Sequence, residues 1–435
     1  MIYKEFLMKI VGLITEYNPF HNGHLYHIQQ AKRTTGADAV IVVMSGDYVQ
    51  RGTPAIMPKR LRTEMALYCG AGAVLELPVC YATGSAEFFA LGAISLLDSL
   101  GIVDSVCFGS ECSDLPLLQK IAGLLVDEPE QYREILRHEL KLGKSFPAAR
   151  QTAVVFCTGD PRCADILKDP NNILGIEYLK ALKKCGSSIR PYTIRRKGAG
   201  YHSSQLDELY SSASAIRSLL AYSSSSIHTE FAGDDSTELS FSDILNELGN
   251  QVPKKCLELL SDFHKIQYPV YQNDFSLILK YKLLNKHPES LVRYMDVSPE
   301  LAARICTSLN DFFNYKQFAG LLKTKELTQT RINRALLHIM LGIKKDSVSE
   351  YMNSGYNFYA RLLGFRKDCS QILTEISKKS SLPLLTKLAE SRELCELGQR
   401  MLRDDILASN LYTSVVTDKF KTAFLNEYKQ RIIKI

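Results

Sequence analysis

Two histidines, in the segment His21-Asn22-Gly23-His24, are the side chains of this 435-residue sequence best suited to phosphate chemistry. Imidazoles three positions apart share one face of a helical turn, where they can donate to phosphate oxygens and stabilise charge on a departing pyrophosphate. Gly23 allows a ligand to approach the backbone closely. The segment follows the apolar run Ile10–Ile14, where a strand is expected to end and a helix to begin. We therefore predict a phosphate site at this turn.

The elements that position this pair are predicted from short β-branched runs that alternate with longer helical stretches. The first two strands are nearly continuous apolar runs, which is typical of strands buried on both faces of a parallel sheet. We expect strands at Ile10–Thr15, Ala39–Met44, Val74–Leu77, Ser105–Gly109 and Ile189–Ile194, and helices at His24–Thr34, Pro58–Tyr68, Ala86–Leu100, Leu115–Leu125 and Ser211–Tyr222. This pattern predicts an open α/β fold, in which ligands bind at the carboxyl ends of the strands.

The second half of the chain is predicted to be mainly helical. Apolar residues recur there at helical spacing, as in Leu336, Leu337 and Leu341, and only Leu411–Val416 has the composition of a strand. The polar stretch before this region, rich in serine, is typical of a linker. We therefore expect an α/β domain at residues 1–222, a linker at 223–240 and a mainly α-helical domain at 241–435.

Composition excludes several classes of protein. The chain has 53 Lys and Arg residues against 47 Asp and Glu, a formal charge of +6, so any surface for a nucleic acid must be a local patch. Its 11 cysteines form no Cys-x-x-Cys pair, which argues against a disulfide framework and a structural zinc site. No run approaches the roughly 20 apolar residues that span a membrane. We expect a cytoplasmic protein with no membrane association, and no protein partner is implied.

The motif His-x-Gly-His after the first strand resembles the signature of the HxGH nucleotidyltransferase superfamily. The longer string GLITEYNPFHNGHLYHI, with MSGDYVQRGTPA and KRLRTEMAL downstream, is similar to one family in particular, the bacterial tRNA(Met) cytidine acetate ligases. The similarity extends to LTQTRINRALLHIMLGI at Leu327–Ile343 and LLGFRKD at Leu362–Asp368. It implies a Rossmann-like, HUP-type nucleotidyltransferase domain that binds ATP, followed by a helical domain that binds elongator tRNA(Met).

This resemblance implies a ligase reaction. Acetate and ATP would form acetyl-adenylate, and the acetyl group would pass to N4 of the wobble cytidine of elongator tRNA(Met), giving N4-acetylcytidine. His21 and His24 would be catalytic, and Mg²⁺ would accompany ATP, with no set of protein metal ligands assigned. Two alternatives are an adenylyltransferase for a small phosphorylated metabolite and a non-catalytic RNA-binding protein. The large helical region argues against the first, and the intact His-x-Gly-His motif argues against the second.

The resemblance also implies which residues contact ATP. In the first strand and turn they are Thr15, Glu16, Tyr17, Asn18, Pro19, Phe20, His21, Asn22, Gly23 and His24, and elsewhere Gly109, Ser212 and Arg217. One asparagine of the pair Asn171-Asn172 and one arginine of the pair Arg195-Arg196 are expected to join them. Asn171 and Arg196 are preferred, with Asn172 and Arg195 as the alternatives. From the sequence alone, the asparagines are equally typical of a helix N-cap.

Two further groups of residues are candidates for the other substrates. The loop between the second strand and the next helix is expected at the carboxyl edge of the sheet, which suits an anion. Its candidates for acetate or phosphate are Asp47, Gln50, Arg51 and Lys59, and Asp47 is also a candidate contact for Mg²⁺. Candidates for the tRNA backbone in the helical region are Lys316, Lys323, Lys325, Arg331, Arg334, Lys419, Lys421, Lys429, Arg431 and Lys434.

Overall fold

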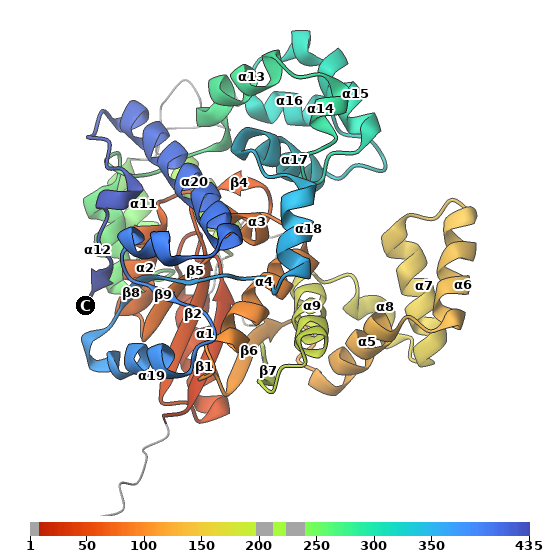
Figure 1. Cartoon of the computed structure of the whole chain (residues 1–435), viewed down its shortest axis with the longest axis horizontal. Helices are drawn as coiled ribbons and strands as arrows, with labels where there is room; N and C mark the ends of the chain where they lie inside the picture. Colours follow the sequence, from red (N-terminus) through yellow and green to blue (C-terminus); the bar gives the residue numbers. More distant parts are fainter. Residues whose placement is uncertain (1–7, 197–211, 223–239) are drawn as a thin grey trace, which may run out of the picture.

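The computed structural model describes residues 8–196, 212–222 and 240–435. Its centre is a sheet with the strand order β10-β8-β5-β2-β1-β6-β7, and β9 pairs with β8 (Figure 1). The strands are β1 (Ile10–Thr15), β2 (Ala39–Ser45), β5 (Ala73–Leu77), β6 (Ser105–Ser110), β7 (Arg190–Arg195), β8 (Ala360–Phe365), β9 (Leu384–Leu385) and β10 (Ile433–Lys434). The ladder from β5 to β7 is parallel throughout. The predicted α/β class is confirmed, and each of the five predicted strands is present with ends shifted by at most one residue.

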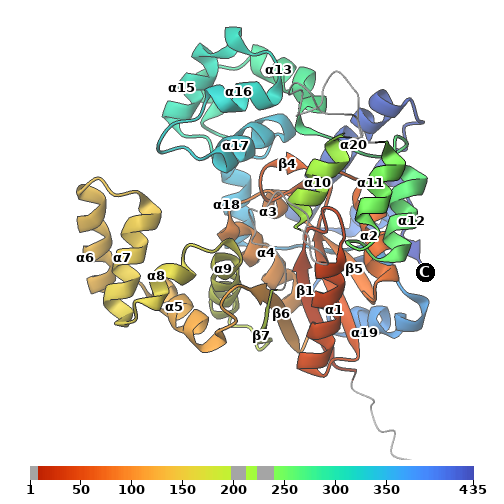
Figure 2. The same cartoon turned by 180° about the vertical axis from the view of Figure 1, so that it is seen from behind.

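The two faces of the sheet build separate cores, because successive side chains of a strand point to opposite faces. Val40 and Val42 of β2 pack with one set of helices, and Ile41 and Val43 pack with another. The first set is α1 (Asn22–Thr35), α2 (Lys59–Tyr68), α10 (Ala213–Tyr222), α11 (Phe241–Leu248) and α12 (Lys254–Phe263), which cover the face seen in Figure 2. The second set includes α3 (Val79–Ala82), α4 (Ala86–Ser99) and α9 (Pro170–Cys185). Both faces are thus covered, as the apolar first strands predict.

The crossover from β6 to β7 is longer than a single helix. It runs through α5 (Leu115–Asp127), α6 (Glu130–Lys141), α7 (Phe146–Thr158) and α8 (Arg162–Ile166) before α9. Helix α7 packs on α5, α6 and α8, and this group of helices projects from the body of the molecule (Figure 1). The sequence predicts a helix at the start of this crossover but not the projecting arm.

A lobe of short helices lies beyond the carboxyl ends of the strands. This helical lobe consists of η1 (Gln272–Phe275), α13 (Ser276–Leu284), α14 (Pro288–Leu291), α15 (Pro299–Thr307), η2 (Leu309–Asp311), α16 (Tyr315–Leu321) and α17 (Gln329–Leu341). It meets the sheet at a hairpin formed by β3 (Tyr48–Val49) and β4 (Thr53–Pro54). The turn residue Gly52 has φ 74°, and a Cβ there would lie 2.3 Å from the backbone nitrogen of Arg334 in α17. Only glycine allows this close approach.

The C-terminal part of the chain returns to the sheet. Strand β8 pairs antiparallel with β5, and β10 pairs with β8. The remaining elements are α18 (Lys345–Asn353), η3 (Lys367–Cys369), α19 (Gln371–Lys379), η4 (Leu388–Glu393), α20 (Glu396–Phe420) and η5 (Glu427–Lys429). The predicted strand Leu411–Val416 is wrong, because these residues lie in α20, where Asp405, Ser409, Tyr412 and Val416 are buried at helical spacing.

The division expected between residues 222 and 241 stays a prediction. Strands from both sides of that point belong to one sheet, to which residues 241–435 contribute β8, β9 and β10. Strand β8, which lies beside β5, is an apolar run too short to stand out among helices in the sequence. The predicted linker lies outside the described residues apart from Ser240, which caps α11. Among the described helices, none has the length and hydropathy to cross a bilayer.

Candidate active site

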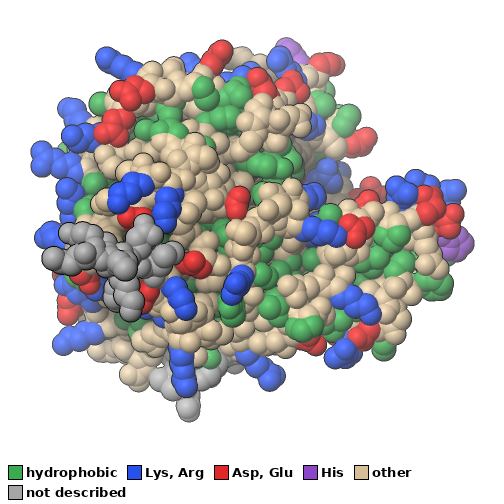
Figure 3. Space-filling model, turned by 60° about the horizontal axis from the view of Figure 1, so that its bottom comes forward, with side chains coloured by type: hydrophobic (Ala, Val, Ile, Leu, Met, Phe, Trp, Pro, Cys, Tyr) green, Lys and Arg blue, Asp and Glu red, His purple; other side chains and the backbone are tan. Residues whose placement is uncertain are grey.

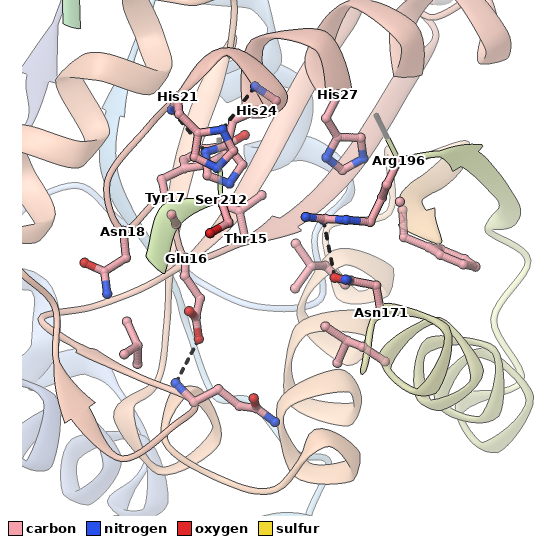
Figure 4. Close-up of a pocket in the computed structure, with 18 of the residues that line it drawn as sticks. Thr15, Glu16, Tyr17, Asn18, His21, His24, His27, Asn171, Arg196 and Ser212 are labelled. Atoms are coloured by element: carbon pink, nitrogen blue, oxygen red, sulfur yellow. Dashed lines mark hydrogen bonds between the residues drawn. The ribbon is translucent and has the colours of Figure 1, made fainter. Parts of the chain in front are cut away.

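A cavity of about 240 Å³ opens at the carboxyl ends of β1, β6 and β7 (Figure 4). Helices α1, α9 and α10 contribute to its walls, together with the β3–β4 hairpin. Of the residues predicted to bind substrates, the lining includes Thr15, Glu16, Tyr17, Asn18, His21, Gly23, His24, Gln50, Arg51, Gly109, Asn171, Arg195, Arg196, Ser212 and Arg217. Segments separated by nearly 200 residues in the sequence therefore meet at one place, the predicted edge of the sheet.

The two histidines of the motif form the start of α1. His21 is the N-cap residue, and its Nδ1 accepts a hydrogen bond from the Gly23 backbone N–H at 3.0 Å. The backbone N–H of His21 in turn donates to Nδ1 of His24 at 3.3 Å, which completes a reciprocal cap. The ring centroids of His21 and His24 are 3.8 Å apart. Because the two histidines occupy the N-cap and N3 positions, the hydrogen bonds of the helix cap fix the orientation of both rings.

These contacts also fix which nitrogen of each ring carries a proton. Burial lowers the pKa of His21 to about 3, with the charges of Arg196 and Arg217 acting in the same direction. Burial, and then His21 and Arg196, hold the pKa of His24 well below its usual range. Both rings are therefore neutral near pH 7. Since each Nδ1 accepts a backbone N–H, each proton is on Nε2, and both rings can donate to an anion in the cavity.

The low pKa of His21 predicts a dependence of stability on pH. An unfolded histidine binds a proton near pH 6.5, whereas folded His21 resists protonation down to about pH 3. The unfolded chain thus binds more protons between these values, and the free energy of unfolding falls as the pH is lowered. We expect His21→Asn, which preserves the N-cap and cannot titrate, to remove about 1.4 kcal/mol per pH unit of this slope in that range.

Urea unfolding of both proteins at pH 7, 6 and 5 would measure this difference. The comparison cancels the contribution of the carboxylates, which both proteins share. An unchanged slope in His21→Asn would show that His21 is not held neutral by the fold.

The turn between β1 and α1 is held by a buried arginine from α2. Arg62 is fully buried, and its Nη1 donates to the carbonyl oxygens of Glu16 at 2.6 Å and Ser45 at 3.1 Å. It also donates to the carbonyls of Gly46 and Met57. Its guanidinium thus ties the ends of β1 and β2 together beneath the cavity. The Glu16 side chain meanwhile accepts the Gln50 backbone N–H at 2.9 Å, which positions the β3–β4 hairpin (Figure 4).

Arg196 reaches the cavity from the end of β7. Its side chain passes over Gly109, where a Cβ would lie 3.1 Å from Cγ of Arg196. Its Nη1 donates to Oδ1 of Asn171 at 3.4 Å (Figure 4). The glycine at the end of β6 thus leaves room for the arginine, and the asparagine orients it. Arg195 also lines the cavity, so both members of the arginine pair are present at its wall.

The two asparagines at the start of α9 have different surroundings. Asn171 lines the cavity, whereas Asn172 is buried and does not. Oδ1 of Asn172 accepts the backbone N–H groups of Glu111 and Cys112 at 2.9 and 3.1 Å. Asn172 therefore holds the loop after β6 against α9. Of the two alternatives, only Asn171 is placed to meet a ligand.

The start of α10 closes the cavity on the other side. Ser212 Oγ accepts the Ala215 backbone N–H at 3.1 Å, as an N-cap residue does. Arg217 donates from Nη1 to the Asn18 carbonyl oxygen at 2.7 Å and from Nη2 to Ser214 at 3.0 Å. Arg217 thus joins α10 to the turn that carries the two histidines.

Some predicted residues lie outside the cavity. They are Pro19, Phe20, Asn22, Asp47, Lys59 and Asn172. Phe20 is buried and packs against Tyr17, and Asn22 donates to the carbonyl oxygen of Asn250. Asp47 accepts the Lys59 backbone N–H at 2.7 Å as the first turn of α2 begins. The Lys59 ammonium is enclosed in a cluster of buried charges with Glu76 and Glu427, away from the cavity.

Sequence reasoning missed His27, which also lines the cavity. Its Nε2 lies 3.2 Å from the carbonyl oxygen of Cys107, so it donates to β6. Burial lowers the pKa of His27 to about 4 in spite of this hydrogen bond. The signal for it was its position, three residues after His24 on the same helix face.

Comparison with known proteins agrees with this geometry. A family model described as HIGH Nucleotidyl Transferase matches residues 8–427. A protein from Acetivibrio thermocellus named tRNA(Met) cytidine acetate ligase is 39% identical over 429 residues, which is 98% of this chain and 100% of the relative. A protein of the same name from Thermoanaerobacter sp. is 44% identical over 406 residues, covering 93% of this chain and 95% of the relative.

Solved structures resemble the whole chain as well. The crystal structure of apo Thermotoga maritima TmcAL superposes with a TM-score of 0.88 at 32% identity, covering 98% of this chain and all of that one. The same protein bound with alpha-thio ATP superposes with a TM-score of 0.86 at 31% identity and the same coverage. The chain therefore belongs to the tRNA(Met) cytidine acetate ligases, a family of HIGH nucleotidyltransferases.

Proposed function

We propose that this protein is an ATP-dependent tRNA(Met) cytidine acetate ligase. It forms acetyl-adenylate from acetate and ATP and transfers the acetyl group to N4 of the wobble cytidine of elongator tRNA(Met). The observation that carries the proposal is the pair of imidazoles fixed by a reciprocal cap at the start of α1, inside a cavity also lined by Arg196 and Arg217. Family membership supplies the identity of the substrates. Because the named relatives are bacterial enzymes of tRNA, the proposed location is the cytoplasm.

The first half-reaction is displacement at the α-phosphorus of ATP. A carboxylate oxygen of acetate attacks this phosphorus, the bond to the bridging oxygen of the β-phosphate breaks, and pyrophosphate leaves with the electron pair. His21 and His24 donate from Nε2 to oxygens on which charge increases, and Arg196 adds a permanent charge. We assign the leaving phosphates to Ser212 and Arg217, at the start of α10, which also line the cavity. Acetate thereby gains AMP as a good leaving group.

The β3–β4 hairpin is the best candidate for the acetate site. Gln50 and Arg51 line the cavity at its edge, and Glu16 fixes the backbone of Gln50. A guanidinium binds a carboxylate with suitable geometry. Of the four residues suggested from the sequence, Asp47 and Lys59 are instead engaged in the buried charge cluster behind the hairpin.

Mg²⁺ would be held mainly by the phosphates of ATP. Glu16 is the one carboxylate in the described lining of the cavity, and no group of three or more His, Cys, Asp or Glu in the described residues is arranged to bind a metal. This donor set fits Mg²⁺, which commonly keeps several waters and takes one or two carboxylates in addition to substrate phosphates. When bound, the ion would neutralise phosphate charge, and Glu16 is the residue that would hold it.

The second half-reaction is attack by the cytidine N4 amine on the acetyl carbon. The bond from that carbon to the AMP oxygen breaks, AMP leaves, and the amine loses a proton. An exocyclic amine is a weak nucleophile, so positioning a base turned out of its stack is expected to supply much of the rate. No covalent enzyme intermediate is required.

Labelled acetate, ATP and purified protein would test the proposal. Acetyl-adenylate should form without RNA, and N4-acetylcytidine should appear when elongator tRNA(Met) is added. An adenylyltransferase for another metabolite would release pyrophosphate without dependence on acetate. A non-catalytic RNA-binding protein would bind the tRNA and release no pyrophosphate. Either result would reject the ligase.

A further inference from the structure

Helix α13 of the helical lobe leaves one apolar face without a partner in the described structure. Leu277, Tyr281 and Leu284 lie at positions i, i+4 and i+7, so they share one side of the helix. They are 80%, 69% and 61% exposed. Phe313, in the loop before α16, is 83% exposed. Single exposed apolar residues are common on proteins, but four large ones in neighbouring segments mark a surface that binds something.

The opposite side of α13 anchors it firmly. Leu279 and Leu283 are buried in the core of the lobe, where α13 packs against α17. The exposed face therefore belongs to a helix that is packed firmly in the lobe. Figures 1 and 2 both show α13 at the outer end of the lobe, away from the sheet.

The loop that carries Phe313 is fixed against α13 by hydrogen bonds. Lys280 Nζ donates to the carbonyl oxygen of Phe312 at 3.2 Å, and Ser276 Oγ accepts the Tyr315 backbone N–H at 3.0 Å. These bonds come from the first and second turns of α13 and lie on both sides of Phe313 in the sequence. Tyr281 and Phe313 thus stand on backbone segments that are held relative to one another. Two aromatic rings on a rigid support are suited to stacking.

The two segments that carry these rings are mainly basic. Residues 276–286 and 312–317 contain Lys280, Lys282, Lys286 and Lys316 and no carboxylate, and Asp274 and Asp311 lie just before them in the sequence. In contrast, on the face shown in Figure 3, Lys and Arg side chains are interspersed with Asp and Glu. Pairing of two identical copies through this face would bring lysines together, which disfavours self-association. A polyanion that also has flat apolar groups matches both the lysines and the exposed apolar side chains of this surface.

The surface is also connected to the catalytic cavity. Helix α17, on which α13 packs, contacts Gly52 of the β3–β4 hairpin through its backbone. Gln50 and Arg51 of the same hairpin line the cavity. Helix α13 is thus connected to the cavity through α17 and the β3–β4 hairpin.

We infer that the surface formed by Leu277, Tyr281, Leu284 and Phe313 stacks unpaired bases of the RNA substrate, with the surrounding lysines facing its phosphates. This inference rests on the proposed function and extends it by placing one contact of the tRNA on the helical lobe. Unpaired loop bases are what RNA-binding proteins stack on aromatic rings, and each such contact contributes substantially to affinity.

Binding of elongator tRNA(Met) to Tyr281→Ala and Phe313→Ala, measured by filter binding at fixed salt, tests the inference. We expect each variant to bind about tenfold more weakly and the double variant about 100-fold more weakly. Tyr281→Phe keeps the ring and should bind like the unmodified protein. Phe156→Ala, which removes another exposed ring, from α7, should also leave affinity unchanged. Acetate-dependent exchange of pyrophosphate into ATP without RNA should stay the same in all of them.

Tyr281→Leu separates stacking from an apolar protein contact. Base stacking requires the ring, so this variant should bind tRNA as weakly as Tyr281→Ala. Full affinity in Tyr281→Leu, or a change in the sedimentation of the RNA-free protein in Tyr281→Ala, would overturn the inference in favour of a protein partner or self-association. Equal tRNA affinity in all variants would also overturn it while leaving the proposed function intact. A failure of the unmodified protein to bind or acetylate the tRNA would instead refute the proposed function.

Discussion

His24→Ala is expected to lower the rate of acetyl-adenylate formation by about 100- to 1,000-fold and to leave the affinity for tRNA nearly unchanged. The magnitude is that of removing one preorganised donor to a developing negative charge. His24 is the second of two neutral rings that donate from Nε2, and its pKa is too low for it to act as a charged group near pH 7. Its contribution is therefore a directed hydrogen bond to the developing charge.

The rate is measured best as acetate-dependent exchange of labelled pyrophosphate into ATP, because this assay needs no RNA. Exchange that persists in His24→Ala would contradict the assignment. A parallel loss of tRNA affinity would show that the motif supports the fold and does not act in chemistry. The exposed His138 of α6 provides a control, since His138→Ala should change neither quantity.

His24 also accepts the backbone N–H of His21, so its loss removes part of the helix cap. His24→Gln is the matched variant that separates the two roles. Glutamine is a usual residue at N3, the position that His24 occupies in the capping box, and it can accept the same N–H. We expect His24→Gln to recover the midpoint of urea unfolding but not the exchange rate. Recovery of both would mean that the helix cap, and not the imidazole, limits the reaction.

The active site could be predicted largely because its central part is contiguous in sequence. Strand β1, the turn and the first residues of α1 carry the imidazoles, and a strand buried on both faces is visible as an apolar run. The family resemblance implies Arg196 and Asn171, and both line the cavity at the carboxyl ends of the parallel strands. The sequence favours Asn171 but gives no physical reason to set Asn172 aside. That reason comes from the structure, where the side chain of Asn172 accepts the backbone N–H groups of Glu111 and Cys112.

Features that depend on contacts between residues far apart in the sequence could not be predicted. Strand β8 has an ordinary apolar sequence, and nothing local shows that it pairs with β5. The same limit applies to Arg62, which resembles an exposed helix residue until the ends of β1 and β2 are seen to surround it. It also applies to Lys59, which has the right charge and the right neighbourhood for acetate. Its partners Glu76, Ser409 and Glu427 come from β5, α20 and η5, so the residues near Lys59 in the sequence do not show that its ammonium belongs to a buried charge cluster.

Lys59→Met is expected to destabilise the protein by about 3–5 kcal/mol, the usual effect of removing one partner from a buried ion pair. The Lys59 ammonium is 2% exposed and lies 2.7 Å from Glu76 and 3.0 Å from Glu427. It also donates to Ser409 Oγ at 2.6 Å. Its neighbours belong to β5, η5 and α20, so the cluster ties the C-terminal part of the chain to the sheet. Removing the ammonium leaves two buried carboxylates with too few cations.

Arg361 of β8 cannot replace the missing charge. It is already paired with Glu76 at 2.9 Å and with Glu427. Burial opposes ionisation of Glu427, but Lys59 and Arg361 outweigh it and lower the pKa of this carboxyl to about 2. Without Lys59, the negative charge of Glu427 stays buried with less positive charge beside it. A second substitution that removes its charge, Lys59→Met with Glu427→Gln, should therefore recover part of the lost stability.

Urea unfolding gives the stability, and acetate-dependent exchange gives the KM for acetate. For Lys59→Met we expect a lower unfolding midpoint and an unchanged KM in the folded protein, because Lys59 does not line the cavity. Arg51→Met, from the hairpin that does line the cavity, should raise the KM for acetate and leave the unfolding midpoint unchanged. If Lys59→Met instead keeps its midpoint and raises the KM for acetate, the ammonium must leave the cluster to meet substrate, and the sequence-based assignment of Lys59 would be the correct one.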